Sequence, residues 1–130
     1  EMCSVRRPIT NTPLQALVLM NDPQYVRASR YLALRVLGEV SDRDERLNRM
    51  AILLRGRPLN ESERLIVVNS LDQFRNIYDS EPKAAEDLLI DEVNDGFSIH
   101  PAEGSSAAEL AAWTMVANQM QNLDEVLNKN

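Results

Sequence analysis

The sequence predicts an all-α domain, a single compact bundle of about six short helices that pack irregularly and include an αα-hairpin. Three observations support this fold class. Apolar side chains recur at the three- and four-residue spacing of a helix face in successive segments. Most of these segments begin with a residue that caps helix N-termini, such as Asn, Asp, Ser or Thr. Strand-like alternation of apolar and polar residues never extends over more than a few positions.

The first helical segment, within residues 10–25, is the one around which we expect the other helices to pack. Thr12 and Gln15 form a capping box, and Pro13 takes the first helical position. The following residues are apolar on nearly all sides, which is typical of a buried helix. An Asn-Asp-Pro sequence then ends this helix and starts the next one. The alternative is a polar rim for a ligand, formed by Thr10, Asn11, Gln15 and Asn21.

Three further helices follow in order. The second is predicted from about residue 22 to 37 and ends at a glycine. The third starts near Asp42 and ends at Gly56. The fourth starts at Asn60, which forms a second capping box with Glu63. Because the connection between the third and fourth helices is short, they are predicted to form an αα-hairpin.

The last third of the chain is predicted to hold two helices and one loop. The fifth helix starts at residues 80–82. Its acidic side chains are expected on a solvent-exposed side; these are Glu86, Asp87, Asp91 and Glu92. Residues 94–105 carry glycine and proline and are predicted to form a loop. The sixth helix begins at the capping residue Ser106 and runs to about residue 122, with Trp113 as the anchor of its buried stripe.

Length and composition limit the class of protein. At 130 residues the chain is expected to be one helical domain, residues 1–130, with residues 1–11 as an extended lead-in. No apolar run approaches the roughly 20 residues of a membrane-spanning helix. With one cysteine and one histidine, the chain cannot supply a four-ligand zinc site. A haem attachment motif is absent as well, so no cofactor is predicted in this chain.

The net charge of −6 hides an uneven distribution. Residues 1–57 carry ten Arg and six Asp or Glu, for a net charge of +4. Residues 58–130 carry four Lys or Arg and fourteen Asp or Glu, for a net charge of −10. The simple interpretation is that the two halves of one domain attract each other. The alternative is a basic face for a phosphate-bearing partner, although the acidic pI of about 4.8 argues against nucleic acid.

The sequence offers no catalytic constellation, because the pattern places no partner beside the single histidine. Whether the chain belongs to an enzyme is therefore left open. The candidates for an interaction site are polar residues of the lead-in, the first helix and two loops; they are Arg6, Arg7, Asn11, Gln15, Arg57 and His100. Arg6 and Arg7 suit the fixed pairing of carboxylates with guanidinium groups.

Three stretches together carry a resemblance to a known family. They are Cys3–Arg7 running into Thr10–Leu17, Gly56–Pro58 followed by Glu61 and Glu63, and Leu110–Asn118 with Asn122–Glu125. They resemble the carboxyl-terminal part of the PSD family, a planctomycete-type family of unknown function. The resemblance implies a carboxyl-terminal fragment of a larger exported protein, in which another domain of unknown function, and often a cytochrome c-like domain, comes first. An extracytoplasmic location is therefore expected, and no catalytic or binding residue can be carried over from the family.

These observations lead to one main functional hypothesis and two alternatives. The main hypothesis is a helical structural or protein-interaction module whose partners are the upstream domains of the same parent protein. The first alternative is an accessory domain that contributes residues to the active site of an extracytoplasmic enzyme acting on a polymer such as a polysaccharide. The second is a docking partner of a cytochrome c-like domain. The oligomeric state is left open.

Overall fold

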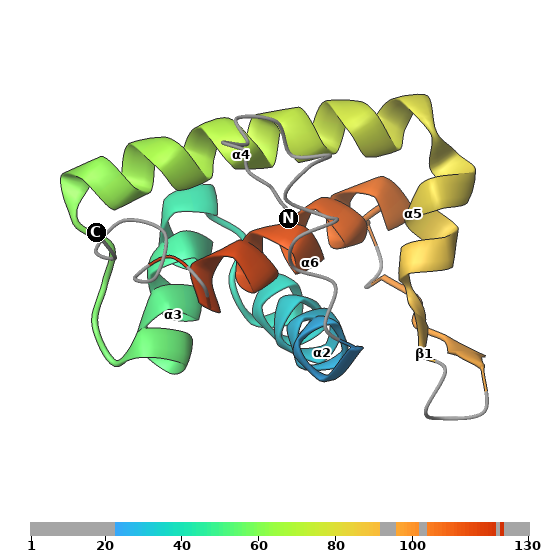
Figure 1. Cartoon of the computed structure of the whole chain (residues 1–130), viewed down its shortest axis with the longest axis horizontal. Helices are drawn as coiled ribbons and strands as arrows, with labels where there is room; N and C mark the ends of the chain where they lie inside the picture. Colours follow the sequence, from blue (N-terminus) through green and yellow to red (C-terminus); the bar gives the residue numbers. More distant parts are fainter. Residues whose placement is uncertain (1–22, 92–95, 102–103, 122, 124–130) are drawn as a thin grey trace, which may run out of the picture.

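The computed structural model describes residues 23–91, 96–101, 104–121 and 123. About 78% of these residues are helical, which confirms the all-α class. The elements follow in the order α2 (Pro23–Glu39), α3 (Arg43–Arg55), α4 (Glu61–Ser80), α5 (Pro82–Leu88), β1 (Ile90–Asp91), β2 (Phe97–Ser98) and α6 (Ala107–Gln121) (Figure 1). The described residues therefore form five helices rather than six. The helix predicted between residues 10 and 22 and the extended lead-in at residues 1–11 lie outside them.

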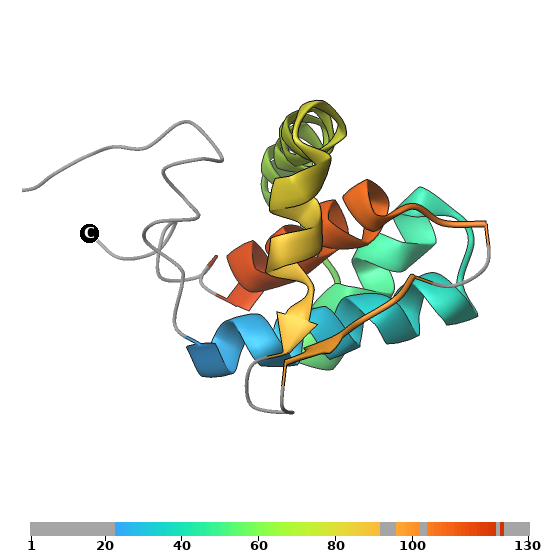
Figure 2. The ribbon, with the colours of Figure 1, turned by 90° about the vertical axis from the view of Figure 1, so that its right-hand side faces the viewer.

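α6 is the central helix of the described fold. Its residues from Leu110 to Asn118 are all buried, and so is Met120. Figures 1 and 2 show α6 between α4 on one side and α2 on the other. Trp113 is 3% exposed, which confirms its predicted role as a core anchor. Among the described helices, the central position that we expected of the first helical segment thus belongs to α6.

Local capping places the starts of α3, α4 and α6 and the end of α3 where the sequence predicts them, whereas α2 runs through Gly38, its predicted stop, to Glu39. The Asp42 carboxylate accepts a hydrogen bond at 3.0 Å from the backbone N–H three residues later. Gly56 ends α3 with a left-handed φ of 80°, a conformation that glycine adopts readily. Asn60 and Glu63 form the predicted reciprocal capping box at the start of α4. Ser106 Oγ likewise accepts at 3.1 Å from the N–H three residues later, so each of these starts satisfies an orphan backbone donor.

The segment after α5 differs from the prediction. α5 ends at Leu88, whereas the sequence pattern continued this helix past Asp91. β1 and β2 instead pair in antiparallel fashion, so the segment 94–105, predicted to be a loop, contains a strand of two residues. The Ile99 N–H donates to the Leu89 carbonyl at 2.9 Å, and both side chains are 2% exposed. Burying these two apolar side chains together favours the extended pairing over a longer helix.

Ion pairs join the basic first half of the chain to its acidic second half, as the charge asymmetry predicted. They include Arg27–Asp91, Arg46–Glu109, Arg55–Glu63 and Arg57–Glu63. The carboxylate side chains of Asp91 and Glu63 are 0% and 3% exposed, so salt screens these pairs less than surface pairs. Among the described residues, none of the helices combines the length and the apolar character that crossing a membrane requires.

Candidate functional site

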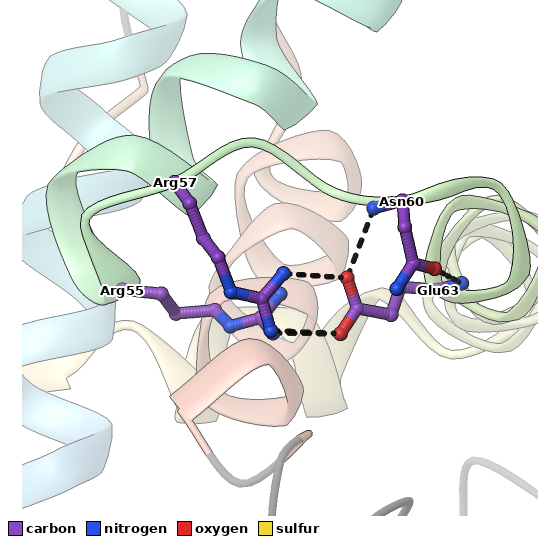
Figure 3. A network of polar contacts seen from close by, with 4 residues as sticks. All are labelled: Arg55, Arg57, Asn60 and Glu63. Carbon is purple, nitrogen blue, oxygen red and sulfur yellow. Dashed lines mark hydrogen bonds and ion pairs between the residues drawn. The ribbon is translucent and has the colours of Figure 1, made fainter.

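The first polar centre is built around Glu63, in the first turn of α4. Its carboxylate accepts a hydrogen bond from Arg55 Nη2 at 2.6 Å. Arg57 donates to the same carboxylate from Nη1 and Nη2, each at 3.3 Å. Figure 3 shows both guanidinium groups converging on Glu63 from the end of α3 and the loop that follows it. The structure therefore places Arg57, a candidate from the sequence, at a buried acidic partner.

The same carboxylate completes the cap of α4. Glu63 Oε1 accepts a hydrogen bond from the Asn60 backbone N–H at 3.0 Å, and Asn60 Oδ1 accepts from the Glu63 N–H at 2.9 Å (Figure 3). One side chain thus ties together the end of α3, the loop and the start of α4. The sequence pattern predicted the capping box, but it did not predict that Arg55 and Arg57 bind the same carboxylate. The local indication of this contact was that the two arginines flank Gly56, at the end of α3.

This environment keeps Glu63 in its charged form. The hydrogen bond from Arg55 is the largest cause that lowers the pKa of Glu63 to about 2. Burial acts in the opposite direction, and the bonds from Asn60 and Arg57 lower the pKa further. A carboxylate that is ionised around neutral pH can only accept hydrogen bonds, so it cannot serve as a general acid there. We therefore assign this network to holding the fold together.

The second polar centre is built around Asp91 of β1, whose side chain is 0% exposed. Arg27 Nε lies 3.0 Å from both carboxylate oxygens. The Tyr31 hydroxyl donates to Oδ2 at 2.7 Å. The Arg27 guanidinium also lies 5.5 Å from the centroid of the Tyr31 ring, within the range of a cation–π contact. Asp91 thereby fixes β1 to α2.

The prediction that Asp91 lies on the solvent-exposed side of a helix is wrong. Because α5 ends at Leu88, the chain turns and brings Asp91 against α2. The hydrogen bond with Asp91 is the main cause that raises the pKa of the Arg27 guanidinium, so the arginine stays charged. The sequence did place Arg27 and Tyr31 one helical turn apart on α2, but no local signal pointed from them to Asp91.

His100 lies apart from Arg57. Its exposed side chain lines a pocket of about 360 Å³, together with Lys83 and Asp87 of α5 and the buried apolar residue Ile99. Figure 1 shows the connection between α3 and α4 and the β1–β2 pair at opposite ends of the molecule. The structure therefore does not bring these two candidate residues together.

The other candidates from the sequence, Arg6, Arg7, Asn11 and Gln15, lie outside the described residues. Within the described ranges, His, Cys, Asp and Glu side chains do not form a group of three or more that could hold a metal ion. The chemistry that the described centres support is thus the pairing of carboxylates with arginines.

Comparison with known proteins gives one match. The model of the PSD1 family, described as a protein of unknown function (DUF1553), matches residues 1–71. No curated protein and no solved structure matches the chain significantly. The family match agrees with the resemblance carried by the first two of the three motif stretches, which lie within these residues. Because it covers 71 of 130 residues, the chain belongs to the PSD1 family.

Proposed function

We propose that this chain is a helical contact module that packs against other domains of a larger exported protein. The observation that supports this function is a set of large aliphatic side chains on the surface of α3 and α4. They are Ile52, Leu53, Leu65 and Ile66, which are 49%, 42%, 64% and 37% exposed. Covering such side chains with a partner recovers about 25 cal/mol for each Å² of apolar surface removed from water.

The paired carboxylates support the same function. Glu63 and Asp91 bind arginines of the same domain, so the described polar centres hold the helices in fixed positions. A docking surface gains affinity when it is already rigid, because less conformational freedom is lost on binding. The rigid frame and the exposed aliphatic side chains therefore belong together in this proposal.

The test uses the full-length gene product. Its upstream part, produced without residues 1–130, is titrated with a separate chain of residues 1–130, and binding is measured by calorimetry. We expect binding that the double variant Leu65→Gln and Ile66→Gln weakens by about tenfold or more. Asn69→Ala, an exposed change on the same helix, is the control and should bind like the wild type. Equal binding by the double variant, or no binding by the wild type, would contradict the proposal.

A second candidate function is favoured by the pocket at His100. A concave site lined by an imidazole and by the charged side chains of Lys83 and Asp87 suits a small ligand or the end of a polymer. In this candidate, the domain contributes His100 to the active site of an extracytoplasmic enzyme that acts on a polymer such as a polysaccharide. If the full-length protein hydrolyses such a polymer, His100→Ala should lower the rate, and an unchanged rate would remove this candidate.

A further inference from the structure

Arg27 and Tyr31 form a partly exposed pair on α2, and the buried side chain of Asp91 holds both of them in place. They are separated by one helical turn and therefore lie on the same face of the helix. The Arg27 side chain is 41% exposed, and Tyr31 is 36% exposed. Both bond to Asp91, which is fully buried beneath them. The surface thus presents a cation and an aromatic ring whose positions are set before any partner arrives.

The way in which Asp91 holds Arg27 leaves the outer part of the guanidinium available. The hydrogen bonds of Arg27 to the described residues all come from Nε, which faces both carboxylate oxygens at 3.0 Å. The N–H groups of Nη1 and Nη2 form a planar fork that matches the two oxygens of a carboxylate. A carboxylate of a partner can therefore bind here without displacing Asp91.

The chemistry of this pair favours a partner that carries a carboxylate, because the guanidinium fork of Arg27 matches the two carboxylate oxygens. Tyr and Arg are also the residues enriched at the energetic centres of protein interfaces, where a ring contributes contact area and a guanidinium contributes directed hydrogen bonds.

We propose that Arg27 and Tyr31, held by Asp91, form a docking site for an acidic protein segment. A Glu or Asp side chain of the partner pairs with the Arg27 fork, and an adjacent apolar side chain packs on the Tyr31 ring. This inference rests on the proposed contact function and names the chemistry of one partner. It concerns a surface on α2, separate from the aliphatic side chains of α3 and α4.

The test is an NMR titration of the whole isotope-labelled chain. The main probe is a short peptide that alternates glutamate with leucine, and its matched control carries glutamine in place of glutamate. Two further probes are inorganic phosphate and a uronic-acid oligosaccharide. We expect the acidic peptide to shift the Arg27 side-chain signal and the amides around it in α2 and β1. The glutamine peptide should leave these signals unchanged.

Arg27→Lys tests the fork itself. Lysine keeps a positive charge beside Asp91 but lacks the two-pronged donor, so affinity for the acidic peptide should fall about tenfold. Arg35→Lys is the matched control, because Arg35 lies on the same helix in an exposed pair with Glu39. Its affinity should stay within about twofold of the wild type. Circular dichroism establishes whether each variant is folded. If Arg27→Lys is not folded, the positions of the peptide-induced NMR shifts in the wild-type chain decide whether the peptide binds at Arg27.

Three results would overturn the inference. The first is peptide-induced shifts spread over all arginines of α2 and α3, and the second is an equal loss of affinity in Arg35→Lys. The third is tighter binding of phosphate or of the oligosaccharide than of the peptide, which would assign the surface to another class of ligand. If the upstream domains bind through Leu65 and Ile66 while no peptide binds at Arg27, the proposed function stands and this inference fails. If the peptide binds at Arg27 while the upstream domains do not bind, the docking site stands and the proposed contact with the upstream domains fails.

Discussion

The guanidinium of Arg46 in α3 lies over the ring of Trp113 in α6, with Cζ 5.7 Å from the ring centroid. Arg46 Nε donates to the Val40 carbonyl at 2.6 Å, and Nη2 donates to the Leu37 carbonyl at 3.4 Å. Nη1 donates to Glu109 at 3.3 Å. The Arg46 side chain is only 12% exposed. Through these hydrogen bonds it connects the carboxyl-terminal end of α2 to the start of α6.

Replacing Arg46 with methionine keeps the apolar stem and removes these bonds. We expect Arg46→Met to lower the free energy of unfolding by about 2–3 kcal/mol, because hydrogen bonds from a charged donor are lost and the α2 carbonyls lose a partner. Urea unfolding measures the change. Arg43→Met is the control, since Arg43 is 50% exposed and lies 3.8 Å from Asp44; it should change stability by less than about 0.5 kcal/mol. Equal losses in the two variants would contradict the assigned role.

Glu63 makes stability depend on pH in the acid range. Its pKa is lowered from 4.5 to about 2 in the folded chain. A lowered pKa means that the folded state favours the ionised carboxylate, so its stabilisation is present above about pH 4.5 and is lost as the pH falls towards 2.

The variant Glu63→Gln isolates this contribution. Near neutral pH it should be about 3–5 kcal/mol less stable than the wild type, because Arg55 becomes a buried charge without its carboxylate. The difference should shrink as the pH falls from about 4.5 towards 2. Denaturant unfolding at a series of pH values measures it, with the exposed neighbour change Glu61→Gln as the control. A difference that is independent of pH would contradict the contribution assigned to the ionised Glu63 carboxylate.

Trp113 tests whether α6 is the centre of the core. Trp113→Ala should lower the free energy of unfolding by about 3–5 kcal/mol, since the side chain is 3% exposed and its removal leaves a cavity. Leu65→Ala removes an apolar side chain that is 64% exposed and should cost less than about 0.5 kcal/mol. Thermal unfolding compares the two variants with the wild type. An unchanged transition in Trp113→Ala would show that α6 packs elsewhere.

The features that the sequence predicted correctly depend on residues close together in the chain. Asp42, Asn60 and Ser106 cap helices through backbone groups three residues away, so a local pattern was sufficient. The burial of Trp113 follows from the helical period in the same way, although α6 is buried all round from Leu110 to Asn118 and not along one stripe. These features establish the all-α class before any long-range contact is known.

The features that the sequence did not predict depend on distant partners. Asp91 binds Arg27 across 64 residues, and β1 and β2 are too short to show a period of two. The run of acidic residues that begins at Glu86 therefore concealed the burial of Asp91. Of the candidate site residues, Arg57 lies at Glu63 and His100 at a separate pocket, because the pattern could suggest polar residues but not their mutual positions.

The family match ends at residue 71, within α4, whereas α6 starts at Ala107. α6 contributes ten buried residues and contacts α2, α3, α4 and α5, so the matched region needs a helix from outside it. We expect a chain that ends at residue 101 to lose its cooperative unfolding transition, because the faces of α2 and α4 that α6 covers become exposed. A peptide of residues 104–123, added in trans, should restore the transition followed by far-ultraviolet circular dichroism. The same peptide with Trp113→Ala is the matched control and should restore it poorly. A cooperative transition in the shortened chain alone would show that α2, α3 and α4 form a core without α6.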